Sequence, residues 1–157
     1  MVFEIERKFL VKGNEWRGLA SGRAYRQGYL STDNERAVRV RTIGSQGFLT
    51  IKGMSIGITR VEYEYEIPLS EADDMLDSFC LRPLIEKKRH KILYEGLIWE
   101  VDEFVGINQG LIIAEVELET DGQEFVLPDW IGQEVTSDQR YYNANLVAAP
   151  FTTWKAL

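Results

Sequence analysis

Charged side chains recur at every second position along several segments of the sequence. Glu4, Glu6 and Lys8 form the first such run, and Arg39 and Arg41 form another, interleaved with valines. Successive side chains of a β-strand point to opposite faces, so a period of two predicts a strand with one charged face. A helix would distribute the same residues around its circumference. The chain is therefore expected to fold mainly as strands.

Eight segments carry strand signals, and they follow one another in meander order. Tight turns separate some of them, for example at 44–47 and at Glu95-Gly96. The expected strands are 2–11, 24–31, 37–43, 48–52, 58–67, 84–94, 97–105 and 111–119. Eight antiparallel strands in this order favour a sheet that curls or closes on itself. The predicted class is mainly β, within α+β.

Two segments have helical spacing instead. Apolar residues in 70–80 recur at helical intervals, with Ser70 as the expected N-cap and Pro83 just beyond the end. A second helix is expected over 138–149, capped by Asp138 and ended by Pro150. Residues 121–137 are expected to form a loop with a short helix near Phe125. These helices would cover the sheet.

Composition excludes several classes of protein. The formal net charge of -7 disfavours nucleic-acid binding, which depends on a basic surplus. One cysteine and one histidine exclude a disulfide scaffold and disfavour a histidine-based metal site, and they fit a reducing cytoplasm. No apolar run approaches the roughly 20 residues of a membrane span, and the N-terminus lacks a signal-peptide pattern. We expect one domain over 1–157, in the cytoplasm, without nucleic-acid or membrane partners.

The charges on the predicted strands carry both signs. The acids are Glu4, Glu6, Glu62, Glu64, Glu100, Asp102, Glu115 and Glu117, and the bases are Lys8, Arg39, Arg41, Lys52, Arg60, Lys87 and Arg89. One interpretation is a solvent-facing sheet surface with cross-strand ion pairs. The other is an enclosed lumen, where carboxylates bind Mg²⁺ or Mn²⁺ and arginines bind phosphate oxygens. The residue pattern alone leaves both open.

Several of these segments, in this order, resemble the CYTH superfamily, the triphosphate tunnel metalloenzymes. The signature Glu-x-Glu-x-Lys occupies positions 4–8, and 27–30, 38–41, 49–53, 60–64, 87–89, 102 and 115–117 follow the family order. The segments 130–136 and 140–143 resemble the C-terminal region of the short bacterial members. The resemblance spans nearly the whole chain.

The resemblance implies an eight-stranded antiparallel tunnel, a closed β-barrel whose charged face points inward. It also implies roles for the charged residues. The implied metal ligands are Glu4, Glu6, Asp102, Glu115 and Glu117. The implied phosphate-binding residues are Lys8, Arg39, Arg41, Lys52, Arg60, Lys87 and Arg89. Glu4, Glu6 and Lys52 are the implied catalytic residues, with Lys52 acting on the leaving pyrophosphate.

Five further residues are candidates without a settled role. Glu62 and Glu64 bind metal or orient the bases, and Glu100 shares their face. Tyr29 either reaches the lumen or packs in the core. Arg140 either lines the entrance or pairs with an acid. Outside this set, His90 should point away from the lumen and Cys80 should end a helix in the core.

The activity implied first is metal-dependent hydrolysis of inorganic tripolyphosphate, or of another triphosphate, to pyrophosphate and phosphate. An adenylate cyclase of class IV type, which forms cyclic AMP from ATP, is the alternative within the superfamily. It ranks second because no adenine-reading residues are recognisable. A non-catalytic module that binds polyphosphate or nucleotide is the alternative from another class. The oligomeric state stays open, with a homodimer among the options.

Overall fold

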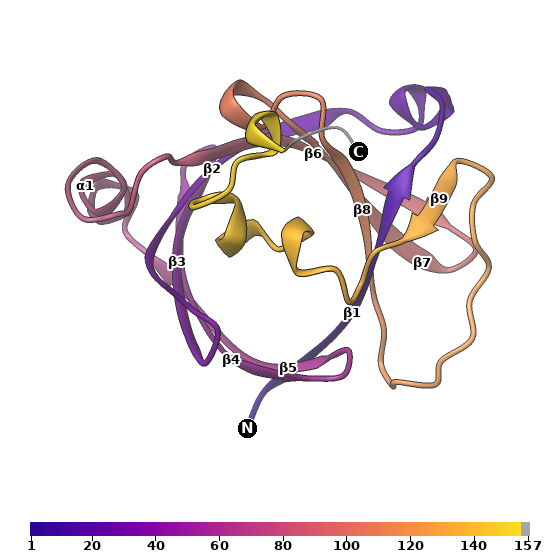
Figure 1. Cartoon of the computed structure of the whole chain (residues 1–157), viewed down its shortest axis with the longest axis horizontal. Helices are drawn as coiled ribbons and strands as arrows, with labels where there is room; N and C mark the ends of the chain where they lie inside the picture. The colour runs from indigo at the N-terminus through magenta and orange to yellow at the C-terminus, as the bar shows by residue number, and fades with distance from the viewer. Residues whose placement is uncertain (155–157) are drawn as a thin grey trace.

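A closed ring of eight antiparallel strands is the centre of the protein, and Figure 1 looks through it. The computed structural model describes residues 1–154; residues 155–157, which the predicted domain includes, lie outside the described part. The ring strands are β1 (Phe3–Val11), β2 (Gly22–Asp33), β3 (Arg36–Ile43), β4 (Gln46–Ile56), β5 (Thr59–Ile67), β6 (Ile85–Tyr94), β7 (Leu97–Phe104) and β8 (Ile112–Glu117). The order around the ring is β1-β5-β4-β3-β2-β6-β7-β8, and β8 returns to β1.

Strand β1 closes the ring by pairing on both edges. Its central part pairs with β8, from Glu6 opposite Glu117 to Leu10 opposite Ile113. Its N-terminal part pairs with β5 over three positions, from Phe3 opposite Val61 to Ile5 opposite Thr59. The predicted closed antiparallel barrel is therefore confirmed, and its eight strands match the expected segments to within a few residues at each end.

A ninth strand, β9 (Ile131–Glu134), was not expected. It pairs with the C-terminal half of β1, beyond the point where β5 leaves that edge. The loop predicted over 121–137 is thus wrong at 131–134, and no helix forms near Phe125. A four-residue strand carries too short an alternation to be recognised, and Val135 extends the contact by donating its backbone N–H to the Lys8 carbonyl.

Helix α1 (Leu69–Ser78) lies outside the ring beside β3 and β4. It was predicted over 70–80, but Pro68 rather than Ser70 occupies the N-cap. Ala72 and Leu76 pack against Val40, and Cys80 joins this small core as expected. No helix within residues 1–154 has the length and apolar character needed to cross a membrane.

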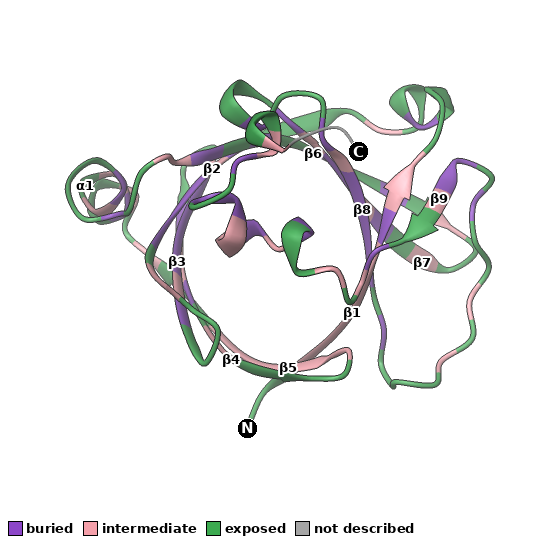
Figure 2. Ribbon diagram, viewed as in Figure 1, coloured by how far each residue is buried: buried purple, intermediate pink, exposed green. Residues whose placement is uncertain are grey.

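The main core lies outside the barrel wall of β6, β7, β8 and β1. Trp16 and Trp99 are fully buried in it, and Trp130 covers the same face. Figure 2 shows the buried residues concentrated along β3, β6 and β8, while β4 and β5 are less covered. His90 lies on this outer side, where its Nδ1 is 2.9 Å from the Ala20 carbonyl oxygen, so its predicted direction away from the lumen is confirmed.

The segment after β9 crosses one end of the ring instead of forming the α-helix predicted over 138–149. It contains three short 3₁₀ turns, η3 (Gln139–Tyr141), η4 (Asn143–Leu146) and η5 (Phe151–Thr153). Figure 1 shows the first two inside the outline of the ring. Tyr141 and Leu146 fill the barrel end against Ile85. In a regular helix these two side chains would point about 140° apart, so packing both into one core favours the irregular segment and explains the wrong prediction.

Candidate active site

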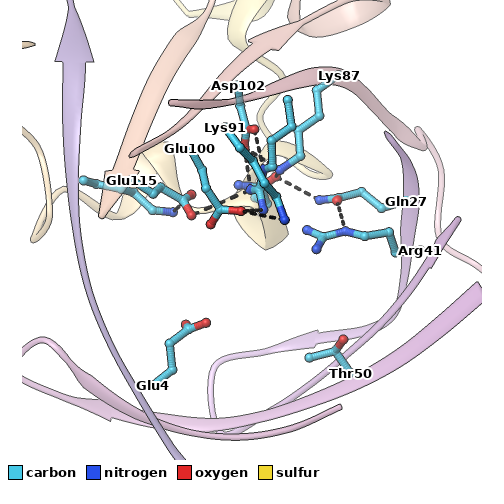
Figure 3. Close-up of polar contacts among 12 residues, drawn as sticks. Glu4, Gln27, Arg41, Thr50, Lys87, Lys91, Glu100, Asp102 and Glu115 are labelled. Atoms are coloured by element: carbon cyan, nitrogen blue, oxygen red, sulfur yellow. Dashed lines mark hydrogen bonds and ion pairs between the residues drawn. The ribbon is translucent and has the colours of Figure 1, made fainter. Parts of the chain in front are cut away.

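The charged faces of the strands point into the ring, and together with the C-terminal segment they line a cavity that opens to solvent. Eleven of the predicted site residues line it: Glu4, Glu6, Lys8, Tyr29, Arg39, Arg41, Lys52, Arg60, Lys87, Arg89 and Glu115. Figure 3 shows Glu4 and Thr50 on one side of this space and Lys87, Asp102 and Glu115 across from them. The interpretation of a solvent-facing charged surface is therefore wrong.

Glu4, Glu62 and Lys52 form one cluster where β1, β5 and β4 meet. Lys52 Nζ donates to Glu4 Oε1 at 3.0 Å and lies 3.4 Å from Glu62 Oε2. Burial alone would raise the pKa of Glu4, but Lys52 and a hydrogen bond from Glu62 lower it to about 2. Burial and the hydrogen bond with Glu4 raise the pKa of Glu62 to about 7. At neutral pH this pair of carboxyls therefore holds a proton part of the time.

Glu6, Lys8 and Glu115 form a second cluster at the β1–β8 pairing. Lys8 Nζ lies 3.3 Å from Glu115 Oε1. Burial opposes ionisation of Glu115, yet Lys8 and Arg89 hold the pKa of Glu115 well below its usual value. Burial and the neighbouring Glu115 and Glu4 raise the pKa of Glu6 well above its usual value. Within residues 1–154, Glu6 forms no ion pair, and its carboxyl shares a hydrogen bond with Glu115.

Arg39 and Arg41 project into the lumen from β3. Arg39 Nη2 donates to Thr50 Oγ1 at 3.2 Å and lies 3.5 Å from Glu64 Oε2. Its Nε is buried and has no hydrogen-bond partner in the described part of the chain. Burial, with repulsion from Arg39 and Arg89, lowers the pKa of Arg41 to about 9. Two buried guanidiniums with an unused donor favour an anionic ligand.

Lys87 and Arg89 of β6 share the carboxylate of Asp102 on β7. Arg89 donates to Asp102 from Nε at 2.7 Å and from Nη2 at 2.8 Å, and Lys87 Nζ lies 2.7 Å from Asp102 Oδ2. Arg89 Nη1 also donates to Glu100 at 3.1 Å. Burial lowers the pKa of Lys87 to about 7, although Asp102 opposes this shift. Asp102 thus lies behind the two bases and holds them toward the lumen.

Several predicted residues lie at the margin of the cavity or outside it. Glu117 is exposed at the end of β8, beyond the lining residues. Arg140 is on the surface, where it forms an ion pair with Asp138 at 2.7 Å and lies over the Trp154 ring. Of the two options for Arg140, the structure supports pairing with an acid. Arg60 lines the cavity, but its guanidinium donates to the backbone carbonyls of Gly53 and Asn34.

The structure adds polar residues that the sequence did not indicate. Gln27 is fully buried on β2 and accepts a hydrogen bond from Arg41, and Thr50 joins Arg39 to Glu64. Asn143 and Tyr142 reach the cavity from the C-terminal segment. Gln27 lies in register with the lumen-facing Tyr25 and Tyr29, which is the signal that could have identified it. Asn143 falls within the segment 140–143 that resembles the CYTH superfamily, but the sequence assigned it no role.

The acidic side chains of the cavity have the chemistry of ligands for a divalent metal. Glu62 Oε2 is buried without a hydrogen-bond partner in the described residues, and Glu6 lines the cavity without an ion pair there. Mutually repelling carboxylates of this kind fit a hard cation that takes oxygen ligands. Within residues 1–154, no three acidic side chains already converge as a metal site, because most of them contact lysines or arginines. The metal ligands named from the sequence therefore stay a prediction.

The fold and the lumen define a tunnel protein, a closed antiparallel barrel with opposed carboxylates and bases inside it. A CYTH domain profile matches residues 3–148, so the chain belongs to the CYTH domain family. An inorganic triphosphatase of Acetivibrio thermocellus is 53% identical to it over 152 residues, covering 97% of each chain. One from Nitrosomonas europaea is 38% identical, covering 91% of this chain and 95% of the relative. The crystal structure of an inorganic triphosphatase is similar with a TM-score of 0.66 and 36% identity, covering 96% of this chain and 98% of that one.

Proposed function

We propose that this protein hydrolyses inorganic tripolyphosphate to pyrophosphate and phosphate, with Mg²⁺ or Mn²⁺ as the metal. The observation that carries the proposal is the meeting of buried bases and crowded carboxylates on the wall of one cavity. The two similar curated proteins, both named inorganic triphosphatase, support the same activity. Tripolyphosphate needs cations along its whole length, and this lumen provides them.

In this proposal the bases bind the phosphate oxygens. Arg39 and Arg41 bind from β3, and Lys87 and Arg89 bind from β6, on another part of the wall. Arginine matches phosphate geometry with two parallel hydrogen bonds, and lysine adds a point charge. Lys8 and Lys52 lie among the carboxylates, where Lys52 is proposed to act on the leaving pyrophosphate. Arg60 shapes the rim through its backbone contacts.

Of the metal ligands implied by the sequence, Glu4, Glu6 and Glu115 are the ones proposed to hold the metal, because Asp102 is occupied by Arg89 and Lys87 and Glu117 is exposed outside the cavity lining. When bound, the metal would supply positive charge to the phosphate oxygens and a more acidic water as nucleophile. Glu4, Glu6 and Glu115 line the cavity. Asp102 contributes mainly by holding Lys87 and Arg89 in place. Glu62 is proposed to orient Lys52 and to share its proton with Glu4.

A substrate panel with Mg²⁺ or Mn²⁺ tests the proposal. Tripolyphosphate, ATP, GTP, thiamine triphosphate and pyrophosphate are supplied in turn, and phosphate, pyrophosphate and cyclic AMP are measured. We expect the fastest turnover with tripolyphosphate and little release from pyrophosphate. Cyclic AMP as the main product from ATP, with tripolyphosphate inert, would instead support the cyclase. Binding without turnover of any substrate would support the non-catalytic module.

The proposed location is the cytoplasm. The only cysteine, Cys80, is a buried free thiol that packs beside α1. A fold without disulfides is typical of reducing compartments.

A further inference from the structure

Asn143, on the 3₁₀ turn η4, contacts the phosphate-binding side of the lumen from the segment that crosses one end of the barrel. Its side chain is buried, and Asn143 Oδ1 accepts two hydrogen bonds. Lys87 Nζ donates one at 3.1 Å, and Gln27 Nε2 donates the other at 2.9 Å. One oxygen of the C-terminal segment thus contacts two strands of the ring.

The contact continues to a second base. Gln27 is fully buried, and its Oε1 accepts a hydrogen bond from Arg41 Nε at 2.9 Å, drawn in Figure 3. The chain of hydrogen bonds therefore runs from Lys87 through Asn143 and Gln27 to Arg41. It joins two bases that lie on different strands, β6 and β3.

The orientation of both amides follows from the two ends of this chain. A protonated lysine and an arginine have donors but no acceptors. Lys87 therefore requires the oxygen of Asn143, which obliges Gln27 to offer its amino group to the same atom. Gln27 is then left with its own oxygen facing Arg41, which also requires an acceptor. The two amides can accept hydrogen bonds from both bases in this one arrangement only, so the chain of hydrogen bonds fixes the position of each base.

The neutrality of the amides matters as much as their geometry. Lys87 already shares the Asp102 carboxylate with Arg89. A further carboxylate near Lys87 would compete with a phosphate oxygen for the same positive charge. An amide oxygen holds the ammonium group in place and leaves its charge available. Asparagine, unlike aspartate, can do both.

The segment that carries Asn143 is itself anchored. Tyr141, Leu146 and Val147 pack into the core at the barrel end, on both sides of Asn143 in the sequence. The Tyr142 hydroxyl donates to the Thr136 carbonyl at 3.2 Å. The position of the Asn143 oxygen is therefore set by packing that does not involve the ligand.

We propose that Asn143 is a positioning residue for phosphate binding, which sets Lys87 directly and Arg41 through Gln27. The inference rests on the proposed function, because these two bases are assigned to the polyphosphate. It gives the C-terminal segment a part in the active site, beyond closing one end of the barrel.

The test compares Asn143→Ala and Asn143→Asp with Asn145→Ala in the full-length protein. Asn145 is a matched control, since it lies in the same turn and its Nδ2 donates to the Gln139 carbonyl at 2.8 Å, outside the cavity lining. We expect both Asn143 variants to raise KM for tripolyphosphate about tenfold, equivalent to about 1.4 kcal/mol. Their kcat should stay within a few-fold of wild type, and Asn145→Ala should keep the wild-type KM.

Asn143→Asp separates positioning from folding. It keeps the size of the side chain and an acceptor for Lys87, so a purely structural role predicts wild-type KM. Positioning by a neutral acceptor predicts a raised KM at a melting temperature close to that of wild type. Wild-type KM in both Asn143 variants, or a loss confined to kcat, would overturn the inference.

Calorimetric binding of tripolyphosphate in EDTA keeps this test separate from that of the proposed function. If wild type binds but does not hydrolyse tripolyphosphate, the proposed activity fails. The inference then stands if the Asn143 variants bind about tenfold more weakly, and falls if they bind equally. If wild type neither binds nor hydrolyses tripolyphosphate, both are refuted.

Discussion

Replacing Asp102 by asparagine should destabilise the fold strongly, although the two side chains have the same shape. The Asp102 carboxylate is fully buried and accepts hydrogen bonds from Arg89 at 2.7 and 2.8 Å, with Lys87 Nζ at 2.7 Å. Burial opposes its ionisation, but Arg89 and Lys87 lower the pKa of Asp102 below its usual 3.8. A carboxyl with a lowered pKa stabilises the folded state above its unfolded pKa and loses that contribution in acid. The effect is therefore fully present at pH 7.

The magnitude follows from the bases that remain. The substituted side chain would be neutral and would place an amide donor where Lys87 and Arg89 need an acceptor, and Arg41 repels the same bases. Breaking a buried ion pair by removing one partner costs about 3–5 kcal/mol. For a domain of this size that corresponds to a fall in melting temperature of roughly 6–20 °C.

Scanning calorimetry at pH 7 measures the fall, with Glu117→Gln as the control. Glu117 is an exposed carboxylate on the neighbouring strand, so its neutralisation should change stability by no more than about 0.5 kcal/mol. Tripolyphosphate should recover part of the loss, because its oxygens return negative charge to Lys87 and Arg89. A melting temperature for Asp102→Asn equal to that of the control would refute the reasoning.

Three further predictions concern the lumen. Glu6→Gln should remove hydrolysis, because the variant loses a proposed metal ligand. Its melting temperature should stay the same or rise, because burial and the adjacent carboxylates raise the pKa of Glu6 and make its ionised form unfavourable. Full activity at limiting Mg²⁺ would contradict the proposed role of Glu6 in metal binding. The pKa of Glu62 is raised from 4.5 to about 7, so the folded state binds a proton at this carboxyl more tightly than the unfolded state does. The resulting stabilisation is complete below pH 4.5 and is lost as the pH rises through 7. Glu62→Gln should therefore flatten the fall in melting temperature between pH 5 and 8 in EDTA, and an unchanged slope would count against it. Tripolyphosphate with a poorly catalytic divalent ion should stabilise the fold by about 2.7 kcal/mol at a hundredfold excess over Kd. Arg39→Gln with Arg41→Gln should abolish most of this gain, and equal stabilisation by sulfate would indicate general screening instead.

The ring was predictable because its alternation is long and its charges are regular. In β1, Glu4, Glu6 and Lys8 alternate with a face that is apolar except at Arg7, and a one-residue slip would turn the charged side chains toward the core. The same regularity identified the bases of β3 and β6. The resemblance to the CYTH superfamily then decided between a charged surface and a charged lumen, which the pattern alone left open.

The C-terminal segment was not predictable in the same way. Its apolar residues have helical spacing, yet Tyr141 and Leu146 are buried while Asn143 between them contacts the lumen. Tertiary packing and the requirement of Lys87 for an acceptor outweigh a weak local preference for helix. The contacts of Arg60 were not predictable for a related reason, since its guanidinium donates to backbone carbonyls that no sequence pattern indicates.

Closure of the ring through β1 determines when the site can exist during synthesis. Glu4 and Glu6 leave the ribosome before the other residues of the site, but Glu6 pairs with Glu117, which is 111 positions later in the sequence. Until β8 emerges, one edge of β1 lacks its partner strand and Glu6 stays apart from Glu115. Pairings between such distant strands are slow to form, and an open strand edge favours aggregation meanwhile. The pairing of Glu6 with the carboxylates of β8 is therefore assembled late, and no nascent chain that ends before β8 can contain the complete site.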